Sequence, residues 1–198
     1  MSKVLSEQLK TVARDSLGYL LEHLPAPEYG SRAAVLALFR GSHFEDAEVL
    51  LILRSKHLAV HAGEVAFPGG GMEMIDMGNP VRTALRECFE EVGINSDWVE
   101  TFGILPLLTT LSGKAAVDPV LGYCSAAASE TLCLDGHEVS AAEWVSVKSL
   151  RASRKTEVRL WSAQEIEFPV FYWGEEKMWG LTAMIFDLIL RRYDRLFS

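Results

Sequence analysis

The feature that most constrains the fold of this chain is a capped helix directly after a glycine-rich turn. Asn79 stands where a helix N-cap belongs, Pro80 where the first helical residue belongs, and Gly93 where a left-handed C-terminal cap belongs. The residues between them are good helix formers. The preceding stretch "GEVAFPGGG" predicts a short strand that runs into the turn. The sequence therefore predicts a helix whose start, end and entry loop are all specified locally.

Patterns of apolar residues and turn signals predict strands on both sides of this helix. They are "RAAVLALF" and "EVLLILR", joined by the polar connector "RGSHFEDA" in a hairpin-like loop, then "ETFGILPLLTT", "AAVDPVLGYC" and "AAEWVSV". "EIEFPVFYW" and "KMWG" predict a hairpin across residues 174–176, and "LTAMIFDLILRRYDRLF" a closing helix. Residues 2–22 predict an opening helix with one apolar stripe that docks on the core. We expect one α/β domain around a mixed sheet, over residues 25–198, with an N-terminal helical extension over residues 1–24.

The composition restricts the possible partners. The chain has 198 residues, is 49% hydrophobic and carries a formal net charge of −8. Such a charge repels polyanions, so no nucleic-acid partner is expected. A small phosphorylated ligand stays compatible with it if metal ions neutralise the phosphate locally.

Cysteine usage and the lack of targeting signals indicate an intracellular location. The three cysteines are odd in number and lack metal-ligand spacing, which favours free thiols in a reducing compartment. No apolar run is long enough for a membrane span, and no signal peptide is evident, so we expect a cytoplasmic protein without a membrane partner. A mitochondrial location stays open because residues 1–20 are amphipathic, although Glu7 and Asp15 argue against it.

Three carboxylates crowd the end of the capped helix. Glu87, Glu90 and Glu91 share one face of a helix, where like charges are mildly destabilising and where the helix dipole disfavours anions. A hard divalent cation among their oxygens would explain both violations. The alternative is a solvated acidic face in which Arg86 and Glu90 form an ordinary i,i+4 pair. The glycine-rich turn favours the cation site, because glycines let the backbone approach a ligand closely.

At these residues the chain resembles the Nudix hydrolases, whose signature is G-x5-E-x7-R-E-U-x-E-E-x-G-U with U a bulky aliphatic residue. "RECFEEVGI" matches every fixed place of its second half except the first U, which is Cys88. In the first half of the signature, Gly71 lies one residue before the position of the signature's glycine. Gly78 occupies the position of the signature's isolated glutamate. The acids near that place are Glu73 and Asp76. The loop before the helix is therefore longer than the pattern.

The longer loop and an upstream motif are similar to the coenzyme A diphosphatase branch of that family. That motif has the form L-L-T-x2-R-S-x3-R-x3-G-x3-F-P-G-G, and "LLILRSKHLAVHAGEVAFPGG" follows it with the first arginine one residue early. Ile52 replaces the threonine and Ala59 replaces the second arginine. "WGLTA", at residues 179–183, also resembles this branch.

The resemblance implies an α/β/α sandwich with a mixed sheet, and hydrolysis of a nucleoside diphosphate derivative with Mg²⁺ or Mn²⁺ as cofactor. The expected substrate is coenzyme A or acyl-coenzyme A, and the expected enzyme is a diphosphatase. From coenzyme A it would form 3′-phospho-AMP and 4′-phosphopantetheine. Alternatives are a Nudix hydrolase for NADH, ADP-ribose or dinucleoside polyphosphates, and a catalytically silent binding module. A homodimer stays open.

The resemblance also assigns roles within the acidic helix and the turn. Glu87 and Glu91 become metal ligands, and Glu90 a ligand or the residue that orients the attacking water. Arg86 supports a glutamate rather than touching substrate. The carbonyl of Gly70 or Gly71 completes the coordination; we assign Gly71 to the metal and Gly70 to the substrate.

Four further residues are candidates outside the signature. Glu138 is a candidate general base or ligand, with a surface loop charge as the alternative. Arg54 is a candidate phosphate contact, with a structural ion pair as the alternative. His61 is expected to be a loop histidine rather than a base, and Glu64 a minor candidate for metal or substrate contact.

Overall fold

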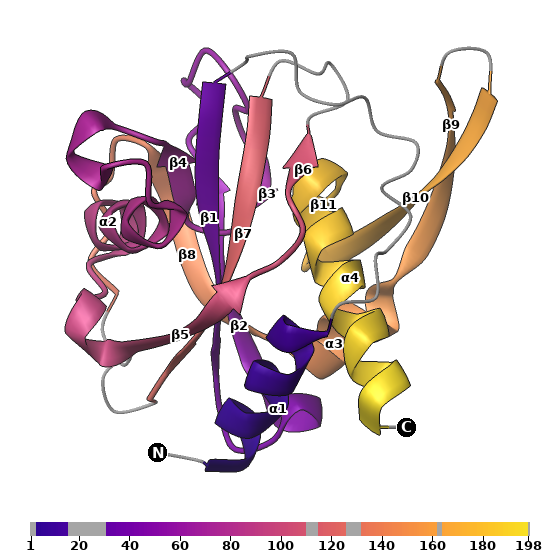
Figure 1. Cartoon of the computed structure of the whole chain (residues 1–198). Coiled ribbons are helices and arrows are strands. Elements are labelled where there is room, and N and C mark those ends of the chain that lie inside the picture. Colours follow the sequence, from indigo (N-terminus) through magenta and orange to yellow (C-terminus); the bar gives the residue numbers. More distant parts are fainter. Residues whose placement is uncertain (1–2, 16–30, 110–114, 126–131, 162–163, 198) are drawn as a thin grey trace.

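A mixed sheet with helices on both faces forms the centre of the molecule (Figure 1). The computed structural model describes residues 3–15, 31–109, 115–125, 132–161 and 164–197. The strands of the central sheet are β1 (Ser31–Arg40), β2 (Glu48–Arg54), β3 (Val65–Ala66), β4 (Gly69–Gly71), β5 (Val99–Ile104), β6 (Leu108–Thr109), β7 (Ala115–Cys124) and β8 (Val139–Ser146). β1 and β7 run parallel, whereas the other pairings of the described strands in this sheet are antiparallel. The predicted mixed sheet is confirmed.

The two faces of β1 bury different cores. Successive side chains of a strand point to opposite faces, so Leu36 lies in a cluster with Cys88 of α2 (Pro80–Val92). Ala37 lies in the larger cluster on the other face, with Leu9 of α1 (Lys3–Arg14) and Phe186 of α4 (Gly180–Phe197). Figure 1 shows α2 on one side of the sheet and α1 and α4 on the other. This is the α/β/α arrangement that the sequence predicts.

Local signals fix α2 where the sequence places it. The Asn79 side chain accepts a hydrogen bond from the Val81 amide at 2.9 Å, which satisfies one of the free amides of the first turn. Gly93 ends the helix at φ 76°, in the left-handed region that suits glycine. Both predicted caps are confirmed, and they set the position of the last turns, which carry the glutamates.

The glycine-rich turn is itself a strand. β4 pairs antiparallel with β1, with Gly69 opposite Val35 and Gly71 opposite Ala33. Gly69 has φ 158°, and a Cβ built on it would lie 2.4 Å from the carbonyl oxygen of Ala34. Only glycine lets β4 approach β1 this closely, so this residue type places the backbone of β4 between β1 and α2.

Three predictions of elements need correction. The opening helix ends at Arg14 and Asp15 is not helical, while residues 16–30 lie outside the described residues. The strand expected to run through Val147 ends at Ser146, whose side chain accepts a hydrogen bond from the Ser149 amide and so begins the short helix α3 (Val147–Ser153).

The third correction concerns the C-terminal strands. β9 (Lys155–Trp161) was not expected, because charged residues interrupt its apolar pattern; it pairs with β10 (Gln164–Trp173). β10 also forms the predicted hairpin with β11 (Glu176–Met178), and the three strands make a second sheet.

In the described part of the chain, no helix combines the length and apolarity that crossing a bilayer requires.

Candidate active site

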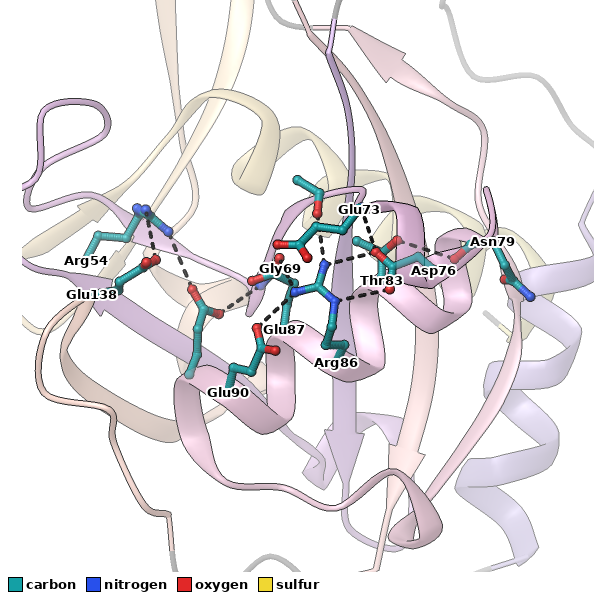
Figure 2. A network of polar contacts seen from close by, with 12 residues as sticks. Arg54, Gly69, Glu73, Asp76, Asn79, Thr83, Arg86, Glu87, Glu90 and Glu138 are labelled. Atoms are coloured by element: carbon teal, nitrogen blue, oxygen red, sulfur yellow. Dashed lines mark hydrogen bonds and ion pairs between the residues drawn. The ribbon is translucent and has the colours of Figure 1, made fainter.

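The last turns of α2, which packs against β4, carry Glu87, Glu90 and Glu91. Figure 2 shows Glu87 and Glu90 beside Arg86. Ala84 and Cys88 on the same helix are buried in the core, and Glu91, three residues after Cys88, lies on this buried side, whereas Glu90 points toward solvent. The three carboxylates differ in environment: Glu91 is almost fully buried, Glu87 is mostly buried and Glu90 is half-exposed.

Glu91 is the most deeply enclosed of the three. Its Oε2 accepts a hydrogen bond from the Gly69 amide at 2.9 Å, and its Oε1 lies 3.5 Å from Nη1 of Arg54. Oε1 is buried and accepts no hydrogen bond from the described residues. Burial raises the pKa of Glu91 to about 8, even though the Gly69 amide and Arg54 oppose this. A positive charge at Oε1 would therefore be strongly favoured.

Glu87 occupies the space that a side chain at Gly70 would fill. A Cβ built on Gly70 would lie 2.5 Å from the carboxylate carbon of Glu87. Burial raises the pKa of Glu87, and Arg86 acts in the opposite direction. Gly71 differs, because a Cβ there would meet nothing within 4 Å. The glycine at position 70 is thus required by the carboxylate, and the one at position 71 is not required sterically.

Arg86 holds the cluster together (Figure 2). Its Nη1 lies 2.9 Å from Oε1 of Glu87 and 2.9 Å from Oε2 of Glu90. Its Nη2 donates to the carbonyl oxygen of Gly71 at 3.0 Å. Hydrogen bonding to Asp76, together with the contact with Glu87, raises the pKa of Arg86 further above its usual range. They agree with a supporting role, which remains a prediction.

Asp76 is the residue that the sequence did not assign. Its two carboxylate oxygens accept from Nε and Nη2 of Arg86, at 3.1 and 3.0 Å, in a two-pronged pair. It is buried, and hydrogen bonding by Arg86 lowers its pKa to about 2. It also accepts from the Glu73 amide, which closes a capping box over a 3₁₀ turn in the lengthened loop. The Glu73-x-x-Asp76 spacing is the sequence signal for this turn.

Arg54 joins a second pair of acids at the other end of the site. Its Nη2 lies 4.0 Å from Oε2 of Glu138, and its Nη1 faces Glu91. Glu138 is half-exposed. Glu91 of the signature and the candidate Glu138 are therefore linked through one arginine. His61 and Glu64 pair with each other, with Nδ1 of His61 2.9 Å from Oε2 of Glu64, and the Arg54 amide donates to the carbonyl oxygen of Glu64.

A cavity of about 560 Å³ adjoins β4, and this volume lies within the range of small-molecule sites. Gly69, Gly70, Gly71 and Arg54 line it at one end and also contact the carboxylate cluster. His61 and Glu64 line it as well. The acids and the cavity thus meet at a strand without side chains.

The residues present fit a divalent cation, although no three His, Cys, Asp or Glu side chains of the described ranges converge into a metal site as they stand. Glu87 and Glu90 pair with Arg86, whereas Glu91 pairs with Arg54. The buried Oε1 of Glu91 has an ion pair with Arg54 but accepts no hydrogen bond from the described residues, which is costly unless a further donor or cation reaches it. Carboxylate and carbonyl oxygens are the ligands that Mg²⁺ and Mn²⁺ prefer.

The comparison with family models agrees with this geometry. The NUDIX domain model matches residues 30–165, which is more than half of the chain. The chain belongs to the Nudix family. Enzymes of this family generally use divalent metal ions.

Several curated proteins are similar in sequence to this Nudix chain. Nudix hydrolase 3 of Caenorhabditis elegans is 33% identical over 153 residues, covering 69% of this chain and 63% of that protein. Peroxisomal coenzyme A diphosphatase ndx-8 of the same organism is 45% identical over 78 residues, covering 39% of this chain and 33% of that protein. The Nudix hydrolase NudL of Pectobacterium atrosepticum is 34% identical over 152 residues, covering 74% and 76%. The chain thus aligns with less than two thirds of the length of the first two.

A solved structure supports the fold. The MutT/nudix family protein from Enterococcus faecalis superposes with a TM-score of 0.57 at 18% identity, covering 96% of this chain and 74% of that one. At this identity the similarity concerns the fold alone.

Gly70→Ala tests whether the close approach of Glu87 to β4 serves cation binding. The new methyl group would displace a flexible carboxylate rather than the backbone, so we expect a folded protein that binds Mn²⁺ at least about tenfold more weakly in calorimetric titration. Gly71→Ala is the matched control, since its methyl group enters open space. Equal Mn²⁺ affinity of the two variants would contradict the assignment.

Asp76→Asn tests the pair with Arg86 through pH. The folded-state pKa of Asp76 is lowered from 3.8 to about 2, so the pair stabilises the fold above pH 4 and this contribution is lost as the pH falls toward 2. We expect the variant to be less stable than wild type by about 1–2 kcal/mol at pH 7 in urea denaturation, and the difference to shrink below pH 4. Asp97→Asn, at an exposed aspartate, is the control. A difference that does not change between pH 7 and pH 2.5 would rule out this origin.

Proposed function

We propose that this Nudix chain is a hydrolase that cleaves the diphosphate linkage of a nucleoside diphosphate derivative with Mg²⁺ or Mn²⁺. The observation that carries the proposal is the convergence of Glu87 and Glu91 on the glycine backbone of β4, beside a cavity of ligand size. The cation would be held by Glu87, Glu90 and Glu91, with the Gly71 carbonyl as a further oxygen. When bound, it screens phosphate charge and lowers the pKa of the attacking water.

The remaining steps fall to the side chains around the acids. Half-exposed Glu90 and Glu138 are the carboxylates that water can reach, so we assign Glu90 to orienting the nucleophile and Glu138 to accepting its proton. Arg54, at the junction of cluster and cavity, contacts a phosphate oxygen. Gly70, which lines the cavity, presents its backbone to the substrate, and Arg86 keeps the glutamates in place without touching the reacting atoms.

We further propose coenzyme A or acyl-coenzyme A as the preferred substrate. The named coenzyme A diphosphatase of C. elegans shares 45% identity over 78 residues. The upstream motif common to that branch contributes Arg54, Phe67, Gly69 and Gly70 to the cavity lining. The products would be 3′-phospho-AMP and 4′-phosphopantetheine. The cytoplasmic location and a homodimer stay predictions.

Glu91→Gln tests the catalytic centre. The amide keeps the shape of the side chain but removes the charge that the cation would meet, so we expect at least about a hundredfold loss in kcat with the fold retained. Glu165→Gln, at an exposed glutamate of β10, should match wild type. Turnover near the wild-type level in a Glu91→Gln protein with an unchanged melting temperature would refute the assignment.

A substrate panel tests the proposed reaction. Coenzyme A, acyl-coenzyme A, NADH, ADP-ribose and a dinucleoside polyphosphate would be incubated with Mg²⁺ or Mn²⁺ and the products identified. We expect the highest kcat/KM for a coenzyme A compound and no turnover after exhaustive chelation. Preference for another compound would support diphosphatase activity but reject coenzyme A as the preferred substrate. Cleavage of none of the compounds would favour the catalytically silent binding module.

A further inference from the structure

The cavity beside β4 has two unlike ends. The charged or titratable side chains of its lining are Arg54, His61 and Glu64, from β2 and the connection between β2 and β3, and Arg32 of β1, which pairs with Asp118. The other wall comes mainly from α4 and the C-terminal strands, and it is largely apolar: Phe168, Trp179, Leu181, Met184 and Ile185. A ligand that fills this cavity therefore has an anionic end and an apolar limb.

Trp179 gives this wall a fixed aromatic surface. The guanidinium carbon of Arg159 lies 4.7 Å from the centre of its ring, as in a cation–π contact. Arg159 does not line the cavity, whereas Trp179 does. Gly180, Leu181 and Thr182 follow it along the same wall. The segment "WGLTA" therefore contributes four consecutive residues to the cavity.

We propose that this cavity receives the pantetheine limb of coenzyme A, that Trp179, Leu181 and Met184 determine specificity by contacting that limb, and that the adenosine half lies outside it. This inference rests on the proposed coenzyme A diphosphatase function and deepens it. It assigns the two halves of the substrate to different parts of the protein.

The chemistry of the limb matches the order of the lining residues. Counted from the diphosphate, the limb begins with a methylene group and a carbon that carries two methyl groups, followed by a hydroxyl and two amides. The methyl groups require apolar contacts close to the phosphate, and Val35 and Phe67 line the cavity together with the glycines of β4. The hydroxyls of Ser31 and Thr182 are available to the amides.

An adenine would be matched less well by the same wall. Recognition of a base edge uses several donors and acceptors in one plane, and unmet polar edges of a buried ring are costly. On the wall formed by α4, the lining side chain with a hydrogen-bonding group is that of Thr182, besides the indole of Trp179 at its start. Its apolar members are suited to a limb with methyl and methylene groups.

Binding of the two product halves separates these assignments without relying on turnover. Met184→Trp and Leu181→Trp place bulk into the cavity from half-buried positions on α4. In calorimetric titrations with Mg²⁺ present, we expect both variants to bind 4′-phosphopantetheine at least about tenfold more weakly, as for the lost burial of about two methyl groups, and 3′-phospho-AMP within about twofold of wild type. Leu196→Trp, at an exposed position near the end of the same helix, should bind both like wild type.

The outcomes distinguish this inference from the function on which it rests. Suppose that wild type cleaves coenzyme A. If the folded variants then lose affinity for 3′-phospho-AMP, or keep wild-type affinity for both products, the cavity assignment is overturned and the function stands. If wild type binds no 4′-phosphopantetheine and cleaves ADP-ribose instead, both are overturned. Circular dichroism and melting curves check the fold, and either tryptophan variant alone is sufficient for the test.

Discussion

The hydrogen bonds of one guanidinium, that of Arg86, hold together the parts from which the site is built. They link α2 to the 3₁₀ turn through Asp76 and to β4 through the carbonyl of Gly71. A lysine has a point charge in place of a planar fork and could not bind both oxygens of Asp76 while reaching Glu87 and Glu90. The lengthened loop is thus anchored by the same residue that positions the acids. The loop before α2 is one residue longer than in the family signature, but it stays attached to α2 through Asp76 and Arg86.

The backbone of β4 is the second requirement, and its three glycines serve different purposes. Gly69 must lie close to the carbonyl of Ala34, and Gly70 must leave space for the carboxylate of Glu87. Because these residues have no side chains, nothing but backbone separates the acids on α2 from the cavity on the other side. A diphosphate at this strand would be reached from the acidic cluster while the remainder of the substrate extends into the cavity.

Features encoded by neighbours in sequence were predictable, and features that depend on packing between distant segments were not. Asn79 and Gly93 act within one turn of their own positions, so the boundaries of α2 follow from the residues themselves. The partnership of Asp76 with Arg86 bridges ten positions through a turn whose spacing differs from the family pattern. The start of α3 depends on Ser146, a single side-chain cap at the end of an apolar strand pattern, and β9 depends on pairing with β10.

The acids themselves were evident from the sequence because they violate two helical preferences together, but their inequality was not. Burial by β4 and the adjoining core makes Glu91 the carboxylate for which a negative charge is costly. The cost of a negative charge on Glu91 also connects the two interpretations of Arg54, as a structural ion pair and as a phosphate contact. With Glu91 uncompensated, its carboxylate attracts the nearby guanidinium, and an ion pair results. A divalent cation beside Glu91 would supply that compensation and repel Arg54, whose buried Nε already lacks an acceptor among the described residues. The guanidinium of Arg54 would then turn to the next available anion, and a substrate phosphate in the adjoining cavity is such an anion. An ion pair with Glu91 in the absence of the cation and a phosphate contact in its presence are therefore consistent states of the same side chain.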